Sequence, residues 1–490
     1  MFEAVELNKK ISKKVFEAEV QDLRTELLDA QESIRTSGIS VIVIISGVEG
    51  AGKSEVVNRL NEWLDARGIR NHAFWKETDE ERMRPTQWRF WRAMPPAGAM
   101  AVMFGSWYTR PIVRHAMGDW DEDRLDAEMG HIDQLERMLC DDGVLVVKLW
   151  YHLSQKAQQQ RIKDKKKNHV NKYLKRYGKN YKTFIASSAR AIRLTDSGNA
   201  PWHLIDAEDW RYRDLKTGKV ILMSLKEAMA RYDAAASNGV LMQKEAKTSA
   251  PLSGKSVFDS VDVDKSLAKP QYRKQLKKYQ DRLHDLSWQA HNAKRSVVAL
   301  FEGWDAAGKG GAIRRLTAAM DARIYSALSV AAPTDEEKAH HYLWRFWRHL
   351  PMDGYITLYD RSWYGRVLVE RVEGFATLEQ WSRAYREIND FEEHLYRHGI
   401  ILAKFWVHIT PEEQLRRFRE REVTPWKQHK ITEEDWRNRQ RWSDYGQAIT
   451  DMVERTSTAY APWTLVPGND KKVARVEIIK TLCERIEQAL

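Results

Sequence analysis

Two glycine-rich loops carry the residue types from which proteins build phosphate sites. The loop in the second half of the chain reads Gly-Trp-Asp-Ala-Ala-Gly-Lys-Gly-Gly over 303–311, and the loop in the first half reads Gly-Val-Glu-Gly-Ala-Gly-Lys-Ser over 47–54. Glycines let backbone N–H groups turn toward phosphate oxygens, and the lysine and the next helix N-terminus add positive charge. The residues predicted to bind phosphate in the second loop are Gly303, Ala306, Ala307, Gly308, Lys309, Gly310 and Gly311.

The second loop departs from the usual phosphate-loop pattern at its end. Ser54 follows the lysine of the first loop, whereas Gly310 stands there in the second, so the hydroxyl that commonly contacts Mg²⁺ is missing. Two carboxylates can replace it, because Asp305 lies inside the loop and Asp360 ends an apolar run at 356–359. We therefore predict Asp305 and Asp360 as the Mg²⁺ site. The alternative for Asp360 is that it caps the following helix.

Arginines follow the second loop in two groups. Arg361 and Arg366 come just after the second carboxylate, and the spacing of Arg417 and Arg421 puts them on one face of a helix. Phosphoryl transfer is catalysed mainly by positioning and by charge stabilisation from Mg²⁺, Lys and Arg. The set therefore predicts a phosphoryl-transfer site. The alternative is that the arginines pair with neighbouring carboxylates, such as Glu420, on a solvated helix.

The elements that must position these groups occur twice at a constant spacing. The sequence Trp-Arg-Phe-Trp-Arg stands at 88–92 and again at 344–348, and the two loop lysines, Lys53 and Lys309, are also 256 residues apart. This self-similarity indicates two copies of one domain. The predicted organisation is an N-terminal domain, a linker and a C-terminal catalytic domain, with the boundaries 1–235, 236–266 and 267–490.

The two copies differ where the chemistry is expected. At the constant offset, Phe104 stands where the second copy has Asp360, and Gly105 stands where it has Arg361. A site that needs two carboxylates for Mg²⁺ is hard to build in the first copy. We therefore predict that the second copy is catalytic and that the first is degenerate.

Short apolar runs alternate with helical patterns in each copy, which favours a parallel sheet covered by helices on both faces. The predicted fold class is α/β. The strands expected from apolar runs lie at 41–46, 101–104 and 144–150 in the first copy and at 297–301, 356–359 and 400–407 in the second.

Composition excludes several classes of protein. The hydrophobic share of 43% over 490 residues rules out a mainly disordered chain, and apolar runs such as 41–45 are too short to span a membrane. The polar N-terminus predicts no signal peptide. Two widely separated cysteines exclude a disulfide framework and a cysteine zinc site, and they indicate a reducing, cytoplasmic location.

The formal net charge of +11 comes from one stretch. Residues 155–193 hold 13 Lys or Arg against one acid, a net charge of +12. This stretch is predicted to dock a long polyanion that feeds the second copy. The alternative is a solvated basic face.

The second copy resembles the family-2 polyphosphate kinases. The resemblance rests on the sequences at 301–311, 359–366, 369–375 and 461–463, and it is weaker in the first copy. It implies a P-loop kinase fold with a helical lid, so the fold expected is two tandem P-loop kinase-like domains. It also implies Mg²⁺-dependent transfer of a terminal phosphoryl group between inorganic polyphosphate and a nucleotide. Trp304 departs from the polar or basic residue of many relatives.

Members of this family with two fused copies resemble polyphosphate:AMP phosphotransferases, which make ADP from AMP. The resemblance implies that Asp305, Lys309, Asp360 and Arg361 are catalytic or bind Mg²⁺ and phosphates. It also implies lid contacts for Arg417 and Arg421, and assembly into homo-oligomers. We predict Arg366 as a further catalytic residue.

Other functions stay open at the level of the sequence. The acceptor could be ADP or a guanine nucleotide, and the donor could be ATP, as in other P-loop kinases. Outside enzymes, the chain could bind an anionic polymer or nucleic acid through vestigial P-loops. No recognised nucleic-acid motif is present, so neither a nucleic acid nor a membrane is the expected partner.

Overall fold

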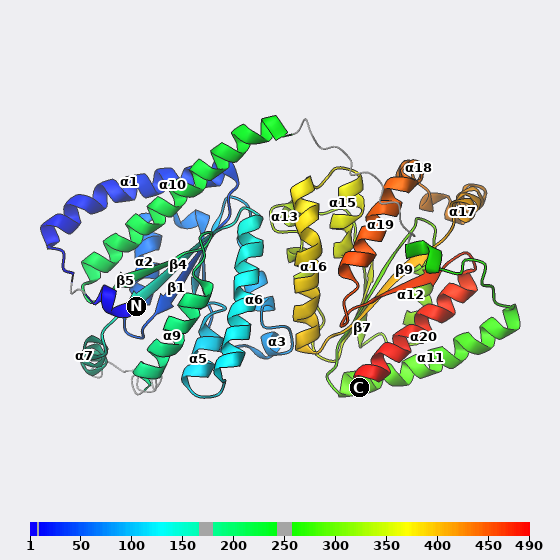
Figure 1. Cartoon of the computed structure of the whole chain (residues 1–490), viewed down its shortest axis with the longest axis horizontal. Helices are drawn as coiled ribbons and strands as arrows, with labels where there is room; N and C mark the ends of the chain where they lie inside the picture. The colour runs from blue at the N-terminus through cyan, green and yellow to red at the C-terminus, as the bar shows by residue number, and fades with distance from the viewer. Residues whose placement is uncertain (7–8, 166–179, 243–256) are drawn as a thin grey trace. The chain divides into compact units, whose positions relative to one another are not determined.

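The computed structural model describes residues 1–6, 9–165, 180–242 and 257–490, which form two α/β units (Figure 1). Each unit consists mainly of one repeat and includes a short segment of the other. The first unit comprises Met1–Glu77, Arg89–Ala246 and Asp335–Trp344, and the second comprises Thr78–Trp88, Lys247–Thr334 and Arg345–Leu490. The predicted α/β class with two tandem domains is confirmed.

Five parallel strands form the sheet of the first unit in the order β2-β3-β1-β4-β5. The strands are β1 (Val41–Gly47), β2 (Ile69–Ala73), β3 (Met100–Phe104), β4 (Leu145–His152) and β5 (Trp202–Asp206). All eight residues of β4 are buried, because helices cover both faces of the sheet.

The sheet of the second unit has the same topology, with the order β10-β9-β6-β8-β7. Its strands are β6 (Val297–Gly303), β7 (Tyr325–Ser329), β8 (Ile356–Asp360), β9 (Ile401–His408) and β10 (Trp463–Pro467). In the register, Phe301 pairs with Asp360 and Gly303 pairs with Val407. The loop after β6 therefore begins between the carboxyl ends of two neighbouring strands, where α/β proteins bind ligands.

Two groups of helices cover the first sheet: α1, α2 and α10 pack together, as do α5, α6 and α9. The helices of the first repeat are η1 (Phe2–Val5), α1 (Lys13–Ser37), α2 (Lys53–Trp63), η2 (Ala66–Gly68), α3 (Asp79–Arg82), α4 (Trp88–Trp91), α5 (Thr109–Ala116), α6 (Glu122–Asp141), α7 (Gln155–Lys165), α9 (Tyr181–Thr195) and α10 (Trp210–Met242).

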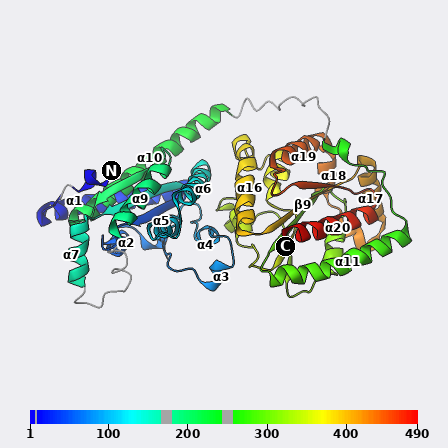
Figure 2. The same ribbon diagram turned by 60° about the horizontal axis from the view of Figure 1, so that its bottom comes forward.

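The second sheet is covered in the same way. Helices α11, α12 and α20 pack together, with α11 and α20 side by side in Figures 1 and 2, and α15, α16 and α19 form the other group. The helices of the second repeat are η3 (Val257–Ser260), α11 (Lys269–Asn292), α12 (Lys309–Thr317), α13 (Asp335–Lys338), α14 (Trp344–Trp347), η4 (Trp363–Val367), α15 (Val369–Val372), α16 (Leu378–His398), α17 (Pro411–Val423), η5 (Pro425–Lys430), α18 (Glu433–Gln440), α19 (Trp442–Thr456) and α20 (Lys471–Ala489). Helices α17 and α18 follow β9, where the lid is expected.

A buried ion pair organises the segment after β8. Lys404 of β9 and Glu392 of α16 have fully buried side chains, with 2.7 Å between Lys404 Nζ and Glu392 Oε2. Trp363 Nε1 and Tyr364 OH both donate to Glu392 Oε1, at 3.0 and 2.7 Å. Lys404 Nζ also donates to the carbonyl of Thr456. The network therefore fixes the residues that follow Asp360, and Trp363 is part of the core.

The first repeat contains the same network. Lys148 Nζ lies 2.7 Å from Glu136 Oε2, and both side chains are buried. Trp107 and Tyr108 donate to Glu136 Oε1 at 2.9 and 2.7 Å, and Lys148 donates to the carbonyl of Thr195. Because the ion pair occurs in both repeats, it belongs to the architecture of the fold rather than to the chemistry of one copy.

The segment predicted as a linker has structure at both of its described ends. Helix α10 continues to Met242, and η3 brings Phe258 onto His408, with ring centroids 4.3 Å apart. The lysine-rich part of the predicted docking stretch, 165–167 and 172–176, lies outside the residues whose side chains the structure describes, so docking there stays a prediction. Among the described helices, none combines the length and the apolar character that a membrane span requires.

Candidate active site

The second glycine-rich loop folds as a phosphate loop. Strand β6 ends at Gly303, and Gly308 caps the N-terminus of α12 with a φ of 114°. A Cβ on Gly303 would lie 2.6 Å from the carbonyl oxygen of Val407, so only glycine fits beside β9. Ala306 also has a positive φ, 63°. This backbone turns the loop around the start of α12, where amide N–H groups and the helix dipole attract anions.

Lys309 is poised over the loop. Its Nζ donates to the carbonyl of Gly303 at 2.6 Å and, more weakly, to that of Trp304 at 3.5 Å. These neutral acceptors do not compensate its charge. The ammonium group can therefore move onto a phosphate at small cost.

One predicted carboxylate lies within this loop and the other faces it. Asp305 is largely buried, accepts a hydrogen bond from Asn438 Nδ2 at 3.0 Å and has Arg361 Nη2 3.7 Å away. A Cβ placed on Gly310 would lie 3.8 Å from Asp360 Oδ2, so Asp360 faces the first turn of α12. The structure thus brings Asp305, Asp360 and Arg361 together around the phosphate loop.

The donor set fits a hard divalent cation that also binds phosphate. Carboxylate oxygens suit Mg²⁺, which usually takes one or two carboxylates and completes its shell with water and substrate phosphates. Within the part of the chain that the structure describes, no three His, Cys, Asp or Glu side chains are arranged to hold a metal by themselves. A metal at Asp305 and Asp360 would therefore bind together with the phosphates.

Glu302 is a third carboxyl group at this site. It is buried at the end of β6 and accepts a hydrogen bond from Ser362 Oγ at 2.7 Å. Burial raises the pKa of Glu302, and the charges of Lys309 and Arg361 oppose this shift. Glu302 links β6 to the turn that carries Asp360 and Arg361. Sequence reasoning missed it, although Ser46 stands at the equivalent position of the first copy.

Arg417 lies beneath the loop rather than above it. Its guanidinium group is buried and donates to the carbonyls of Ala306 and Ala307, at 2.9 and 2.8 Å, and of Gly468 and Asn469, at 2.6 and 2.9 Å. Its Nε donates to a carboxylate of the same helix. The predicted lid contact of Arg417 with phosphate differs from this geometry, in which every guanidinium nitrogen is already used.

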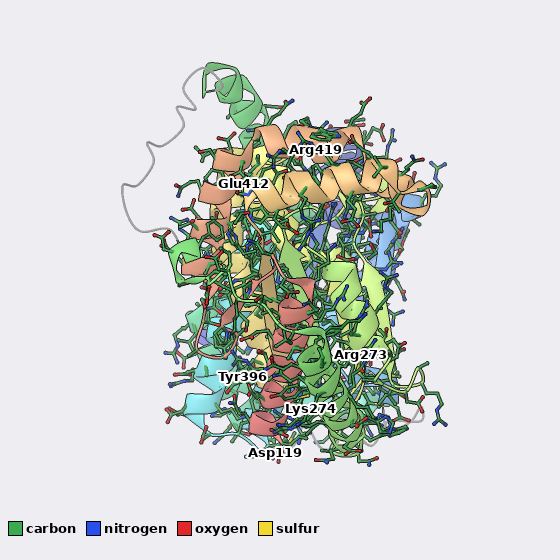
Figure 3. The ribbon with its side chains drawn as sticks, turned by 90° about the vertical axis from the view of Figure 1, so that its right-hand side faces the viewer. Asp119, Arg273, Lys274, Tyr396, Glu412 and Arg419 are labelled. Carbon is green, nitrogen blue, oxygen red and sulfur yellow. The ribbon has the colours of Figure 1, made fainter. Side chains whose placement is uncertain are left out.

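The surroundings of Arg417 follow from the local sequence of α17. Thr410 caps the helix by accepting from the amide of Glu413, and the proline at 411 occupies the first turn. One face of α17 then carries Gln414, whose Nε2 donates to the carbonyl of Asp305, and Arg417. The opposite face carries Glu412 and Arg419, which are exposed (Figure 3).

The other two predicted arginines lie nearby in different roles. Arg366 forms an ion pair with Glu370, with 3.2 Å between Nε and Oε2. Arg421 stands one turn beyond Arg417, half-buried, and its charge acts on Asp435 in the first turn of α18. Burial and the negative charge of Asp305 raise the pKa of Asp435.

Trp304 points into the protein. Its ring stacks on Trp442 with centroids 3.6 Å apart, and its Nε1 donates to His408 Nδ1 at 3.2 Å. Asn438, which binds Asp305, lies just before this stack and accepts from Tyr445 OH at 3.2 Å. The tryptophan thus ties the phosphate loop to the α18–α19 segment.

In the first phosphate loop an arginine also donates to a loop carbonyl, but the space at the loop is occupied by side chains of the protein. Arg161 Nη1 donates to the carbonyl of Gly50 at 2.8 Å, as Arg417 does in the second loop. Lys53, however, pairs with Glu49 inside the loop at 3.1 Å. Arg213 Nη1 lies 1.6 Å from the position of a Cβ on Gly52, so its guanidinium fills the space against the loop. This supports the prediction that the first copy has lost the site.

Arg417 and Arg161, which donate to the carbonyls of the two phosphate loops, give the first testable prediction. Replacing Arg417 by Ala leaves several buried carbonyls without donors, which we expect to cost about 3 kcal/mol of unfolding free energy and to lower activity strongly. Replacing Arg161 by Ala should destabilise the chain similarly while activity at low temperature is retained. Thermal unfolding measures the stability of the two variants, and initial rates measure their activity. Retained activity in the stable fraction of Arg417→Ala would contradict the positioning role.

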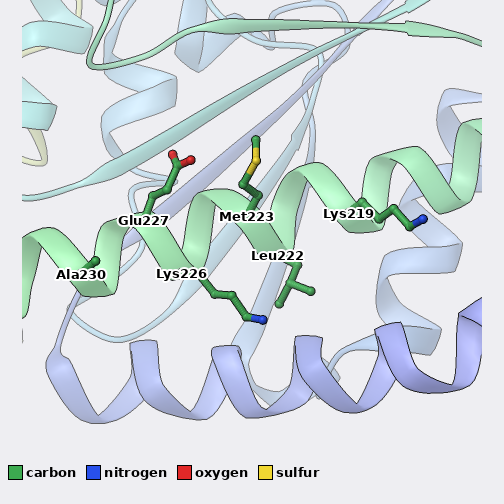
Figure 4. Close-up of a pocket in the computed structure, with 6 residues that line it drawn as sticks. All are labelled: Lys219, Leu222, Met223, Lys226, Glu227 and Ala230. Carbon is green, nitrogen blue, oxygen red and sulfur yellow. The ribbon is translucent and has the colours of Figure 1, made fainter.

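A surface depression on α10 is not a competing site. It is lined by Lys219, Leu222, Met223, Lys226, Glu227 and Ala230 (Figure 4). Its lysines are neutralised by α1, because Lys219 pairs with Glu19 and Lys226 with Glu26, each at 2.5 Å. No phosphate-loop residue lines it.

Comparison with known proteins decides the family. The family model described as Polyphosphate kinase 2 (PPK2) matches residues 10–233 and again 266–490, so both repeats are covered. The chain belongs to the polyphosphate kinase 2 family. It is 45% identical, over its whole length and 99% of the relative's, to a polyphosphate:AMP phosphotransferase of Pseudomonas aeruginosa.

Two further relatives place the chain within the PPK2 family. A crystal structure described as a polyphosphate kinase 2 from Pseudomonas aeruginosa PA01 superimposes with a TM-score of 0.89 at 45% identity, covering 100% of this chain and 99% of the other. A shorter relative, an ADP-polyphosphate phosphotransferase of P. aeruginosa, is 41% identical over 46% of this chain and 74% of its own length. The two-repeat PPK2 architecture is therefore shared along the full length with the first of these.

Proposed function

We propose that this PPK2 protein transfers the terminal phosphoryl group of inorganic polyphosphate to AMP, forming ADP, in a reversible and Mg²⁺-dependent reaction. The observation that carries the proposal is the full-length match to a polyphosphate:AMP phosphotransferase, combined with an intact site in one repeat only. The catalytic unit is the C-terminal domain, 267–490. The N-terminal domain, 1–235, is degenerate, and the boundaries stay predictions.

The residues of the second copy have distinct roles in this proposal. The loop amides from Gly303 to Gly311 and the ammonium group of Lys309 hold the phosphates of the donor. Asp305 and Asp360 would hold Mg²⁺, which neutralises charge on the phosphate oxygens when it is bound. Arg361, 3.7 Å from Asp305, is placed to stabilise the charge of the transferring group.

No strong general base is needed for the transfer. The attacking oxygen belongs to the phosphate of AMP and is already ionised. It forms a bond to the terminal phosphorus of polyphosphate while the bond from that phosphorus to the bridging oxygen breaks. The shortened polyphosphate leaves with the bridging oxygen and its negative charge, which Lys309 is placed to stabilise. Glu302 and Arg417 act by positioning the turn and the loop.

The direct test uses purified protein, long-chain polyphosphate, AMP and Mg²⁺ without ATP. We expect ADP to form and to be abolished by chelation of the metal. Parallel reactions replace AMP by ADP or GMP, and polyphosphate by ATP, because a shorter PPK2 relative acts on ADP. Absence of ADP with polyphosphate and AMP would refute the proposal, and a rate that depends on ATP would assign a different donor.

Two further properties belong to the proposal. The two cysteines, Cys140 and Cys483, are free, and this supports a reducing, cytoplasmic environment. We also propose assembly into homo-oligomers, which light scattering of the purified protein tests. A monomeric mass at micromolar concentration would contradict that assembly.

A further inference from the structure

Three cationic side chains line the start of α12 on its α20 side. A Cβ on Gly308 would lie 3.9 Å from Lys471 Cγ, so this lysine lies at the end of the phosphate loop. A Cβ on Gly311 would lie 3.4 Å from Arg475 Nη2 and 3.9 Å from Arg315 Nη1. The two guanidinium groups thus converge on the first turn of α12, just beyond Lys471.

Their positive charges are not neutralised. Among the residues that the structure describes, none of the three forms an ion pair with a carboxylate. Burial, followed by the charge of Arg417, lowers the pKa of Lys471 to about 8; Lys427 and Arg416 add to this effect, and Glu420 opposes it. A bound anion would relieve this excess of positive charge.

At the equivalent positions of the first repeat, the positive charge is either paired with a carboxylate or replaced. Arg59 corresponds to Arg315 at the constant offset, and Asp214 corresponds to Arg475, counted from the start of the equivalent helices α10 and α20. Asp214 is buried and lies 3.2 Å from Arg59 Nε. A carboxylate therefore neutralises the arginine in the degenerate copy, where the catalytic copy has a second arginine.

The position of Lys471 is also changed in the first repeat. Trp210 begins α10 where Lys471 begins α20, and the Arg59 guanidinium lies 5.8 Å from the centre of a Trp210 ring. The next turn carries Arg213, which fills the first phosphate loop. Loss of the strand-end carboxylate in this copy thus coincides with neutralisation or replacement of the positive charge at these three positions.

We propose that Arg315, Lys471 and Arg475 form a subsite for internal phosphates of the polyphosphate donor, which runs from the phosphate loop along α12 and α20. This rests on the proposed function, because the donor is taken to be polyphosphate. Asp360 lies next to Gly310, whereas the three cations lie next to Gly308 and Gly311. The terminal phosphate is therefore directed to the carboxylates and the remaining chain to the cations. Short donors would not need the subsite.

The test replaces Arg475 by Asp, the residue of the first repeat. We expect the KM for long-chain polyphosphate to rise about a hundredfold. The KM for AMP should stay unchanged, and the rate with tripolyphosphate should change much less. Arg314→Asp is the matched control, because this arginine lies on the same helix, is exposed and gives the same change of charge. Arg315→Gln and Arg475→Gln, with thermal unfolding curves, exclude a folding defect.

Direct binding separates the subsite from the reaction. A labelled long-chain polyphosphate is titrated into wild type, Arg475→Asp and Arg314→Asp without AMP. Weaker binding in Arg475→Asp alone supports the subsite even if wild type forms no ADP, which would overturn only the proposed function. Equal binding and equal KM in the two variants, or equal effects on long and short donors, would overturn the subsite.

Discussion

Replacing Lys309 by Ala is expected to lower kcat/KM for AMP phosphorylation by about a thousandfold, equivalent to about 4 kcal/mol of transition-state stabilisation. In the structure, the ammonium group of Lys309 donates to the neutral carbonyls of Gly303 and Trp304, so it can follow negative charge onto the bridging oxygen of the donor. Asp360→Asn should cause a loss of the same order, because the neutral amide binds a divalent cation poorly.

The first repeat supplies the matched control. Lys53→Ala removes the equivalent lysine, whose charge is already held by Glu49 within the closed loop, and we expect more than about half of the activity to remain. Initial rates with saturating polyphosphate measure the activity of all three variants, and unfolding curves show whether each variant is folded. Comparable losses from Lys53→Ala and Lys309→Ala would refute the division of labour between the repeats.

Replacing Lys404 by Met is expected to lower the free energy of unfolding by about 3–5 kcal/mol, because it leaves the carboxylate of Glu392 buried without its cation. Both side chains are fully buried, and burial lowers the pKa of Lys404. The substitution keeps the volume and apolar stem of the lysine, so the loss reports the ion pair and its hydrogen bonds rather than a cavity.

Lys148→Met tests the same network in the first repeat, which we propose to be degenerate. We expect a loss of similar size from calorimetric unfolding, since the two networks share their geometry. Glu392→Gln added to Lys404→Met should recover part of the stability, because the amide still accepts from Trp363 while the buried charge is gone. A loss below about 1 kcal/mol in Lys404→Met would show that the pair does not stabilise the fold.

The central strands could be predicted from sequence and the edge strands could not. β1 and β6 contain continuous apolar runs, and the apolar runs of β4 and β9 are each interrupted by one buried lysine, because both faces of these strands are covered. The edge strands are different: β7 (Tyr325–Ser329) has no buried residue, and β2 buries only Ile69. Such strands are held by backbone pairing to one neighbour, and their side chains leave no apolar signal.

The site was predictable where its residues are consecutive or follow a strand end. Asp305, Lys309, Asp360 and Arg361 do come together, since the parallel register brings the ends of β6 and β8 to one edge. The contacts of Arg417 with the loop carbonyls could not be predicted, because helical spacing gives the face of a helix but not what that face meets. The presence of Arg161 at the same offset in a copy that lacks the strand-end carboxylate was the available sign of a role in the fold.

The duplicated ion pair also bears on how substitutions in this protein change its abundance in the cell. The first repeat, which we propose to be degenerate, still holds a buried Lys148–Glu136 pair whose loss is expected to destabilise its unit. A destabilisation of about 1–2 kcal/mol can already change cellular abundance several-fold through chaperones and proteases. Harmful variants are therefore expected in both halves of the gene, those in the first half acting through the amount of enzyme and those in the second through amount or turnover.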